Sequence, residues 1–153
     1  MHDEIQTVAT FGPLVVLCWR GQADAQRSQR QHDLIVEIAR SKEVLAMVVL
    51  LEPNASPPDG ASREILRKSM LISPQKTVAA AYVIRDEGFG GAIKRGVITG
   101  LSLMAKQPYP VRTFQTDGEA LLWLESLLRS RNTALGQVTA LEFLKQVRAR
   151  PSA

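Results

Sequence analysis

The stretch that decides the fold is Thr77–Lys106, TVAAAYVIRDEGFGGAIKRGVITGLSLMAK. It opens with an unbroken apolar run, 78–84, which is typical of a strand that is covered on both faces and therefore lies inside a sheet. A polar, glycine-rich turn follows at 85–91, and apolar residues then recur every three or four positions. That spacing predicts a helix that packs back onto the sheet. The face expected to point inward consists of Phe89, Ile93, Val97, Leu101 and Met104.

The same helix carries a line of small residues, Ala92, Gly96 and Gly100, at intervals of four. Each glycine inside a helix costs roughly 1 kcal/mol relative to alanine, so we expect another element to approach this line closely. The helix's own sheet is the favoured neighbour, because three alanines make the preceding strand thin. A second subunit is the alternative. A membrane-embedded helix pair is disfavoured, since Lys94 and Arg95 leave too short an uncharged span.

Toward the N-terminus, the sequence predicts a hairpin followed by a helical crossover. The β-prone segment 5–11 and the apolar run 14–19 flank Gly12-Pro13, a natural turn between antiparallel strands. Helical spacing over 22–42 then leads to a second fully apolar run, 44–51. A helix between two strands favours a right-handed crossover and parallel pairing.

Toward the C-terminus, the pattern alternates helix, strand and helix. A helix begins near Ala61 or Ser62, and a short strand at 111–114 is expected at an edge of the sheet. Thr116 or Asp117 caps the next helix, whose apolar stripe closes the core. After a break at 130–136, helical spacing resumes over 137–150, either to cap its own domain, which we favour, or to dock on another subunit. The predicted organisation is one α/β domain over 1–130, with a linker and accessory helix over 131–153.

Composition narrows the function classes. At 45% hydrophobic residues, the 153-residue chain can bury a sizeable core. The 19 Lys and Arg residues give a net charge of +4 but form no long run, and aromatic residues are few, so we expect no nucleic-acid partner. The segment 1–4 lacks the basic and apolar regions of a signal peptide, and no apolar run reaches membrane-spanning length. The sequence therefore predicts a cytoplasmic protein without a membrane span.

The sequence offers few residues that could bind a metal or act as a nucleophile. Cys18 is the only cysteine, and it lies in an apolar run where it behaves as a small hydrophobe. His32 is expected on a helix surface, because the adjacent Asp33 points about 100° away from it and cannot orient the ring. With one further histidine, a zinc site has too few ligands. We predict no catalytic residue, no metal and no cofactor.

The loop after the strand 44–51 is the candidate site. Glu52–Gly60 contains Pro53, Pro57 and Pro58 and cannot continue either regular structure. Ligands of open α/β sheets favour the edge where strands lead into helices, so this loop and 85–91 are expected to flank one surface. An ordinary solvated connection is the equal alternative.

The order strand, strand, helix, strand, helix, strand, helix, strand, helix resembles bacterial STAS or SpoIIAA-like domains. The strongest match is Val111-Arg112-Thr113-Phe114 leading into Glu119-Ala120-Leu121-Leu122-Trp123-Leu124, and the resemblance covers roughly 5–128. It implies a small mixed sheet with helices packed largely on one face, and regulatory binding instead of catalysis.

In anti-sigma-factor antagonists of that family, a phosphorylatable serine or threonine lies where the third strand meets its following helix. The matching region here is 52–62, which holds Ser56 and Ser62 but lacks the Asp-Ser-Ser/Thr-Gly context. Ser62 ranks ahead of Ser56 because it lies closer to the helix start, where amides favour an anion. The candidate partner or regulatory loop comprises Asn54, Ser56, Asp59 and Ser62.

Three functions compete at this point. The first is a regulatory module that binds another protein through the loop 53–62, with a homodimer through Ala92, Gly96 and Gly100 as a further expectation. The second is a protein that binds a small apolar ligand or lipid, which the small residues Ala92, Gly96 and Gly100 along one helix suggest and which requires an apolar pocket. The third is a nucleotide-binding enzyme using 88–91; however, Ile93 replaces the last glycine of the dinucleotide fingerprint, and no Gly-Lys-Ser/Thr sequence is present.

Overall fold

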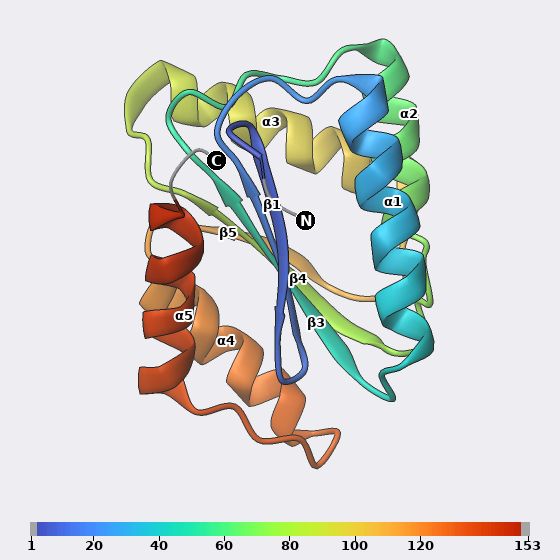
Figure 1. Cartoon of the computed structure of the whole chain (residues 1–153), viewed down its shortest axis with the longest axis vertical. Helices are drawn as coiled ribbons and strands as arrows, with labels where there is room; N and C mark the ends of the chain where they lie inside the picture. The colour runs from blue at the N-terminus through green and yellow to red at the C-terminus, as the bar shows by residue number, and fades with distance from the viewer. Residues whose placement is uncertain (1–2, 151–153) are drawn as a thin grey trace.

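A five-stranded mixed sheet forms the centre of the computed structural model, which describes residues 3–150 (Figure 1). Two predicted regions therefore lie partly outside the described residues. These are the N-terminal segment 1–4, at residues 1–2, and the C-terminal region 131–153, at residues 151–153. The first two strands pair antiparallel, and every later neighbour pairs parallel. These pairings confirm the predicted hairpin, the crossover and the edge position of the last strand. In spatial order the strands are β1 (Gln6–Phe11), β2 (Leu14–Trp19), β3 (Leu45–Leu51), β4 (Thr77–Ile84) and β5 (Val111–Phe114).

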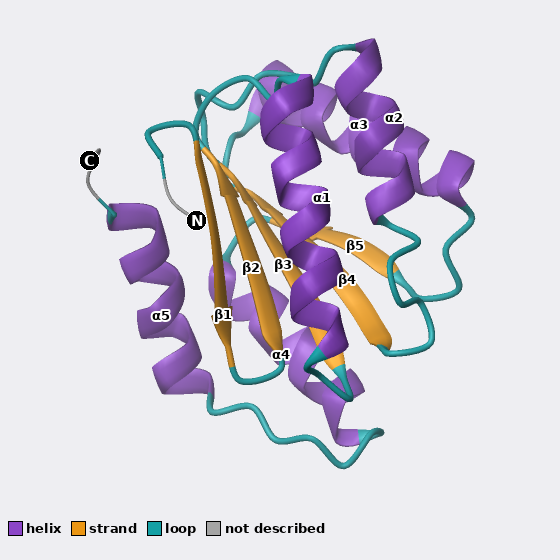
Figure 2. Cartoon of the chain, turned by 45° about the vertical axis from the view of Figure 1, so that its right-hand side comes forward, coloured by secondary structure: helices purple, strands orange, loops and turns teal. Residues whose placement is uncertain are grey.

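Helices cover both faces of this sheet (Figure 2). The resemblance implied helices largely on one face, and this detail is corrected. The reason is the sequence of β2 and β3, whose side chains are apolar on both faces and need a cover on each. One face carries α1 (Ala25–Arg40), α2 (Gly60–Ser69) and α3 (Gly88–Ala105), and the other carries α4 (Asp117–Arg129) and α5 (Gln137–Ala149).

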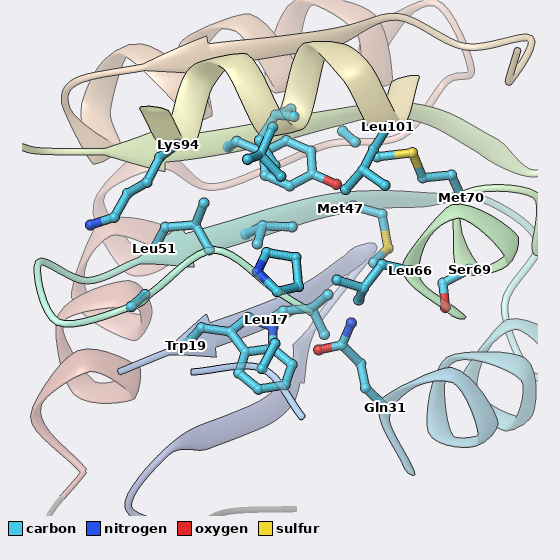
Figure 3. Close-up of a pocket in the computed structure, with 18 of the residues that line it drawn as sticks. Leu17, Trp19, Gln31, Met47, Leu51, Leu66, Ser69, Met70, Lys94 and Leu101 are labelled. Carbon is cyan, nitrogen blue, oxygen red and sulfur yellow. The ribbon is translucent and has the colours of Figure 1, made fainter. Parts of the chain in front are cut away.

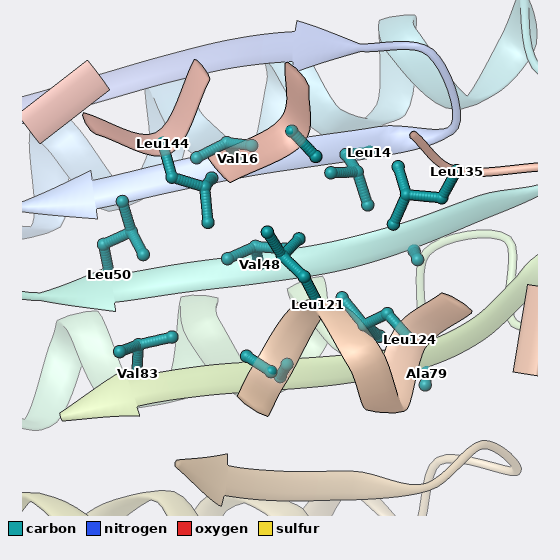
Figure 4. Close-up of a cluster of buried hydrophobic side chains, with 14 of the residues drawn as sticks. Leu14, Val16, Val48, Leu50, Ala79, Val83, Leu121, Leu124, Leu135 and Leu144 are labelled. Carbon is teal, nitrogen blue, oxygen red and sulfur yellow. The ribbon is translucent and has the colours of Figure 1, made fainter. Parts of the chain in front are cut away.

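Alternate residues of the strands divide the core into two clusters. Along β2, Val16 and Cys18 point to the α4–α5 face, whereas Leu17 and Trp19 point to the opposite face. This is the period of two that a pleated strand imposes. Figure 4 shows the α4–α5 cluster, in which Leu121 and Leu144 reach across the sheet residues. Its labelled members are Leu14, Val16, Val48, Leu50, Ala79, Val83, Leu121, Leu124, Leu135 and Leu144.

The C-terminal helix α5 is part of this core. Ala140, Leu144 and Val147 are fully buried, so α5 caps its own domain, as the favoured interpretation of the sequence held. Arg148 also binds the carboxylates of Glu52 and Asp117. The helix predicted as accessory is therefore integral to the packing.

The orientation of α3 differs from the prediction. Its buried residues are Gly91, Lys94, Ile98, Leu101 and Ala105. Of the residues that were predicted to point inward, only Leu101 is buried. A Cβ placed on Gly96 or Gly100 would meet no atom within 4 Å, so the expected close approach to the sheet is not made at these two glycines. The helix is apolar on two opposite faces, and periodicity alone therefore could not select the inner one. No helix in the described part of the chain is long and apolar enough to cross a membrane.

Candidate ligand pocket

An apolar cavity of about 100 Å³ lies between the sheet and α1, α2 and α3 (Figure 3). Its volume is below the roughly 300–1,000 Å³ typical of pockets for drug-sized ligands, but it approaches the ~150 Å³ of an apolar cavity that takes up benzene. Leu17, Met47 and Val49 form its floor on the sheet, and Leu66 and Leu101 close it from the helices. The cavity therefore suits a small, mainly apolar molecule.

Small side chains create this space. Ala80 on β4, together with Ala23 and Ala55 in the loops, lines the cavity where larger residues would fill it. Close packing is the norm in protein interiors, and voids larger than a water molecule are few. The run of alanines in β4 was predicted to make the sheet thin against α3. Its effect at Ala80 is to leave room for a ligand.

Tyr82 brings a hydroxyl without a partner to the wall of the cavity. Tyr82 belongs to β4, and its hydroxyl makes no hydrogen bond with any residue in 3–150. Burial raises the pKa of Tyr82 above its ordinary value, with a smaller contribution from Tyr109, so the phenol keeps its proton. The neighbouring Tyr109 is different, because its hydroxyl donates a hydrogen bond of 2.6 Å to the carbonyl of Met70. Tyr82 is thus free to bind a polar group of a ligand.

A second polar group comes from α1. Gln31 is 2% exposed and lines the cavity, and its Oε1 accepts a hydrogen bond of 2.7 Å from Nε2 of Gln6. Its own Nε2 has no acceptor among the described residues, and Figure 3 shows the amide directed toward the cavity. Buried amides normally satisfy both ends, so this donor is the second group that a ligand can engage.

Lys94 fixes the wall of the cavity at α3. Its stem lines the cavity, while Figure 3 shows its ammonium group directed away from the centre. The Nζ atom lies 2.6 Å from Asp86 Oδ2 and donates to the carbonyl oxygens of Glu52 and Pro53 at 3.0 and 3.1 Å. Helical spacing placed Lys94 away from the face that was predicted to point inward. Its partners come from the ends of two strands, which helical spacing cannot reveal.

The predicted loop contributes to the site, although not as expected at every residue. Asn54 and Ser56 are exposed, and Ser56 also lines the outer side of the cavity. Asp59 is the N-cap of α2 and accepts a 2.8 Å hydrogen bond from the backbone N–H of Ser62. Ser62 is fully buried, and its hydroxyl donates to the carbonyl of Ala23 at 3.1 Å. The preference for Ser62 as a surface switch is therefore corrected, since only Ser56 of the two serines is exposed.

The glycine-rich turn is explained by backbone packing. Gly88 has a φ of 72°, a conformation that favours glycine. A Cβ on Gly91 would overlap the carbonyl oxygen of Asp86, so glycine lets α3 begin directly against the end of β4. The resemblance of 88–91 to a phosphate-binding turn thus has a structural cause that needs no ligand.

The structure does not bring Cys18 and His32 together. Cys18 is buried on the α4–α5 face of the sheet, where desolvation raises the pKa of its thiol. His32 lies on α1 and shares a 2.9 Å hydrogen bond with the hydroxyl of Ser69. Within residues 3–150, no three His, Cys, Asp or Glu side chains gather closely enough to hold a metal ion.

Comparison with models of known protein families finds no match for this sequence. A search of curated proteins likewise finds no matching relative. The fold and the cavity define an α/β protein with a small apolar pocket.

Proposed function

We propose that this chain is a non-catalytic, cytoplasmic binding protein for a small apolar molecule that carries one hydrogen-bonding group. The observation that carries the proposal is the Tyr82 side chain on the wall of a mainly apolar cavity, with a hydroxyl that has no hydrogen-bond partner among the described residues. A ligand group that forms a hydrogen bond with this hydroxyl contributes about 0.5–1.5 kcal/mol to binding. The apolar walls supply the remaining affinity.

The cavity supports the ligand-binding hypothesis, but through other residues than those that first suggested it. The ligand-binding hypothesis began from Ala92, Gly96 and Gly100, yet none of these residues lines the cavity. The opposite face of the same helix does, through Lys94, Val97 and Leu101. The motivation was wrong at those positions, and the hypothesis now rests on the inner face of α3.

A regulatory role through a protein partner is the second candidate, as the resemblance to STAS or SpoIIAA-like domains implies. Support comes from the loop 55–58, which lines the cavity from outside, with Ser56 and Pro57 exposed to solvent. A ligand in the cavity would contact the inner side of this loop and favour one of its conformations. Partner binding and ligand binding would then both depend on the conformation of this loop.

Tryptophan fluorescence tests the proposed function. Trp19 lines the cavity, whereas Trp123 lies on α4 at the other face, so a Trp123→Phe chain reports on Trp19 alone. We expect saturable changes on titration with benzyl alcohol, which combines a benzene-sized body with a hydroxyl. Native mass spectrometry of gently purified protein is the companion measurement, because it detects a ligand retained from the cell.

The control variants fill space inside and outside the cavity. Ala80→Leu places extra carbons in the cavity and should abolish the fluorescence change. Ala61→Leu adds the same atoms on the exposed side of α2 and should leave it intact. Equal responses of both variants would contradict a site in this cavity.

A further inference from the structure

The outward face of α3 is an apolar stripe with a notch at its centre. Phe89, Ile93, Leu103 and Met104 are 82%, 39%, 71% and 65% exposed. At 3.6 residues per turn these positions share one side of the helix with Gly96 and Gly100, opposite the buried face. Bulky residues thus stand at both ends of the stripe, and glycines without neighbours within 4 Å lie between them.

Opposite charges mark the two ends of α3. Glu87 is the N-cap of α3 and Lys106 is its C-cap, and both are exposed. Neither side chain forms an ion pair within the described part of the chain. The helix therefore begins at an acidic residue and ends at a basic residue, and both are free to pair with another molecule.

We propose that this face of α3 binds a second copy of the same chain, with the two α3 helices antiparallel about a two-fold axis beside Gly96. In this register Ile93 of each copy faces Gly100 of the other, and Phe89 faces Met104. The same register sets Glu87 opposite Lys106 twice. A single register thus places bulky residues against glycines and acidic residues against basic ones, as a self-complementary two-fold interface requires.

The charge pattern favours a second copy over a lipid surface. An anionic membrane attracts Lys106 but repels Glu87, whereas an antiparallel copy satisfies both. The notched profile also fits the ridge of a facing helix better than a flat surface. Small residues at helix contacts allow the backbones to approach closely, which gives a role to the glycines that the sheet does not use.

Sedimentation velocity over a range of protein concentrations tests the interface. We expect a species of twice the 16.8 kDa chain mass that dissociates on dilution. Gly100→Leu fills the notch and should shift the dimer dissociation constant at least tenfold toward monomer. Its melting temperature should stay equal or rise, because the added side chain meets open space and replaces a helical glycine.

A charge exchange keeps the test independent of that variant. Glu87→Lys alone should weaken the dimer, and Glu87→Lys combined with Lys106→Glu should restore it. Val138→Glu changes an exposed residue on α5 and should leave assembly unchanged. A chain that is monomeric at every concentration would overturn the proposal, as would a dimer that ignores both variants. Co-sedimentation of monomer with vesicles containing phosphatidylglycerol, in place of dimerisation, would assign the face to lipid and overturn it too.

Discussion

The ammonium group of Lys94 lies 2.6 Å from Oδ2 of Asp86, and this ion pair joins α3 to the end of β4 beside the cavity. The Lys94 side chain is 8% exposed, so the pair is shielded from solvent. Lys94 also donates to two carbonyl groups at the end of β3. One side chain therefore connects a helix, two strand ends and the loop that walls the pocket.

Replacing this lysine should lower both stability and binding. In Lys94→Met the apolar stem is kept, but Asp86 and the two carbonyl groups lose their donor. Removing one member of a buried ion pair typically costs about 3–5 kcal/mol, and we expect a loss near the lower end in urea unfolding. Lys68→Met, at an exposed lysine of α2 that forms no ion pair among the described residues, should leave the unfolding midpoint unchanged. If Lys94→Met is as stable as the wild type, the ion pair does not stabilise the fold.

The two tyrosines near the cavity should respond in opposite ways to loss of the hydroxyl. Tyr82→Phe removes a group without a partner, so the free energy of unfolding should stay within about 0.5 kcal/mol of wild type or rise. Tyr109→Phe deletes the bond to Met70 and should cost about 1 kcal/mol.

Loss of the Tyr82 hydroxyl should instead weaken ligand binding. We expect Tyr82→Phe to weaken benzyl alcohol binding about tenfold, which corresponds to one hydrogen bond of ~1.4 kcal/mol. Toluene, which has the same shape without the hydroxyl, should bind the two proteins equally. If benzyl alcohol does not distinguish Tyr82→Phe from wild type, the hydroxyl is not part of the site.

The cap of α2 gives the fold a defined acid sensitivity. The hydrogen bond from the backbone N–H of Ser62 lowers the pKa of Asp59 below 3.8. A carboxylate with a depressed pKa stabilises the folded state above pH 3.8, and this contribution disappears as the pH falls below that value. Asp59→Ala should therefore melt at a lower temperature than wild type at pH 6, with a difference that shrinks toward pH 2.5. Thermal melts at both pH values measure this, and a constant difference would argue against an ionised cap.

Removing the last helix should prevent folding. A chain ending at Ser130 exposes the core side chains that α5 covers, including the fully buried Leu124. Leu144 of α5 is itself fully buried, and burying one leucine side chain contributes about 1.5–3 kcal/mol, a large share of the stability of a small domain. We expect no cooperative thermal transition by circular dichroism. A truncated chain that melts cooperatively would mean that 131–153 is accessory after all.

Strand pattern and connection lengths were sufficient to predict the sheet. The apolar runs 14–19, 44–51 and 78–84 became neighbouring central strands, and the turn at Gly12-Pro13 became the hairpin. These features follow from local periodicity and from the rule for parallel crossovers. The cover on the second face was missed because nothing in the order of elements states on which side α4 and α5 return.

The candidate site was less predictable, because its key residues break the simple pattern. Lys94 and Gln31 are polar residues on helix faces that became buried, and each binds a partner distant in the sequence. Tyr82 offered a signal, since it is the one residue with a polar group in the run 78–84. Part of the predicted loop 52–60 lines the cavity, but the burial of Ser62 depends on the carbonyl of Ala23, 39 residues earlier.

The most direct test of the central claim is a methyl NMR titration with ¹³C-labelled methionine. Met47 and Met70 line the cavity, whereas Met104 is exposed on the outer face of α3 and serves as an internal reference. If the cavity binds a small apolar alcohol, added benzyl alcohol shifts the Met47 and Met70 signals with a common saturation curve while Met104 stays in place. Unchanged Met47 and Met70 signals, or a shift at Met104 alone, would contradict the pocket as the functional site.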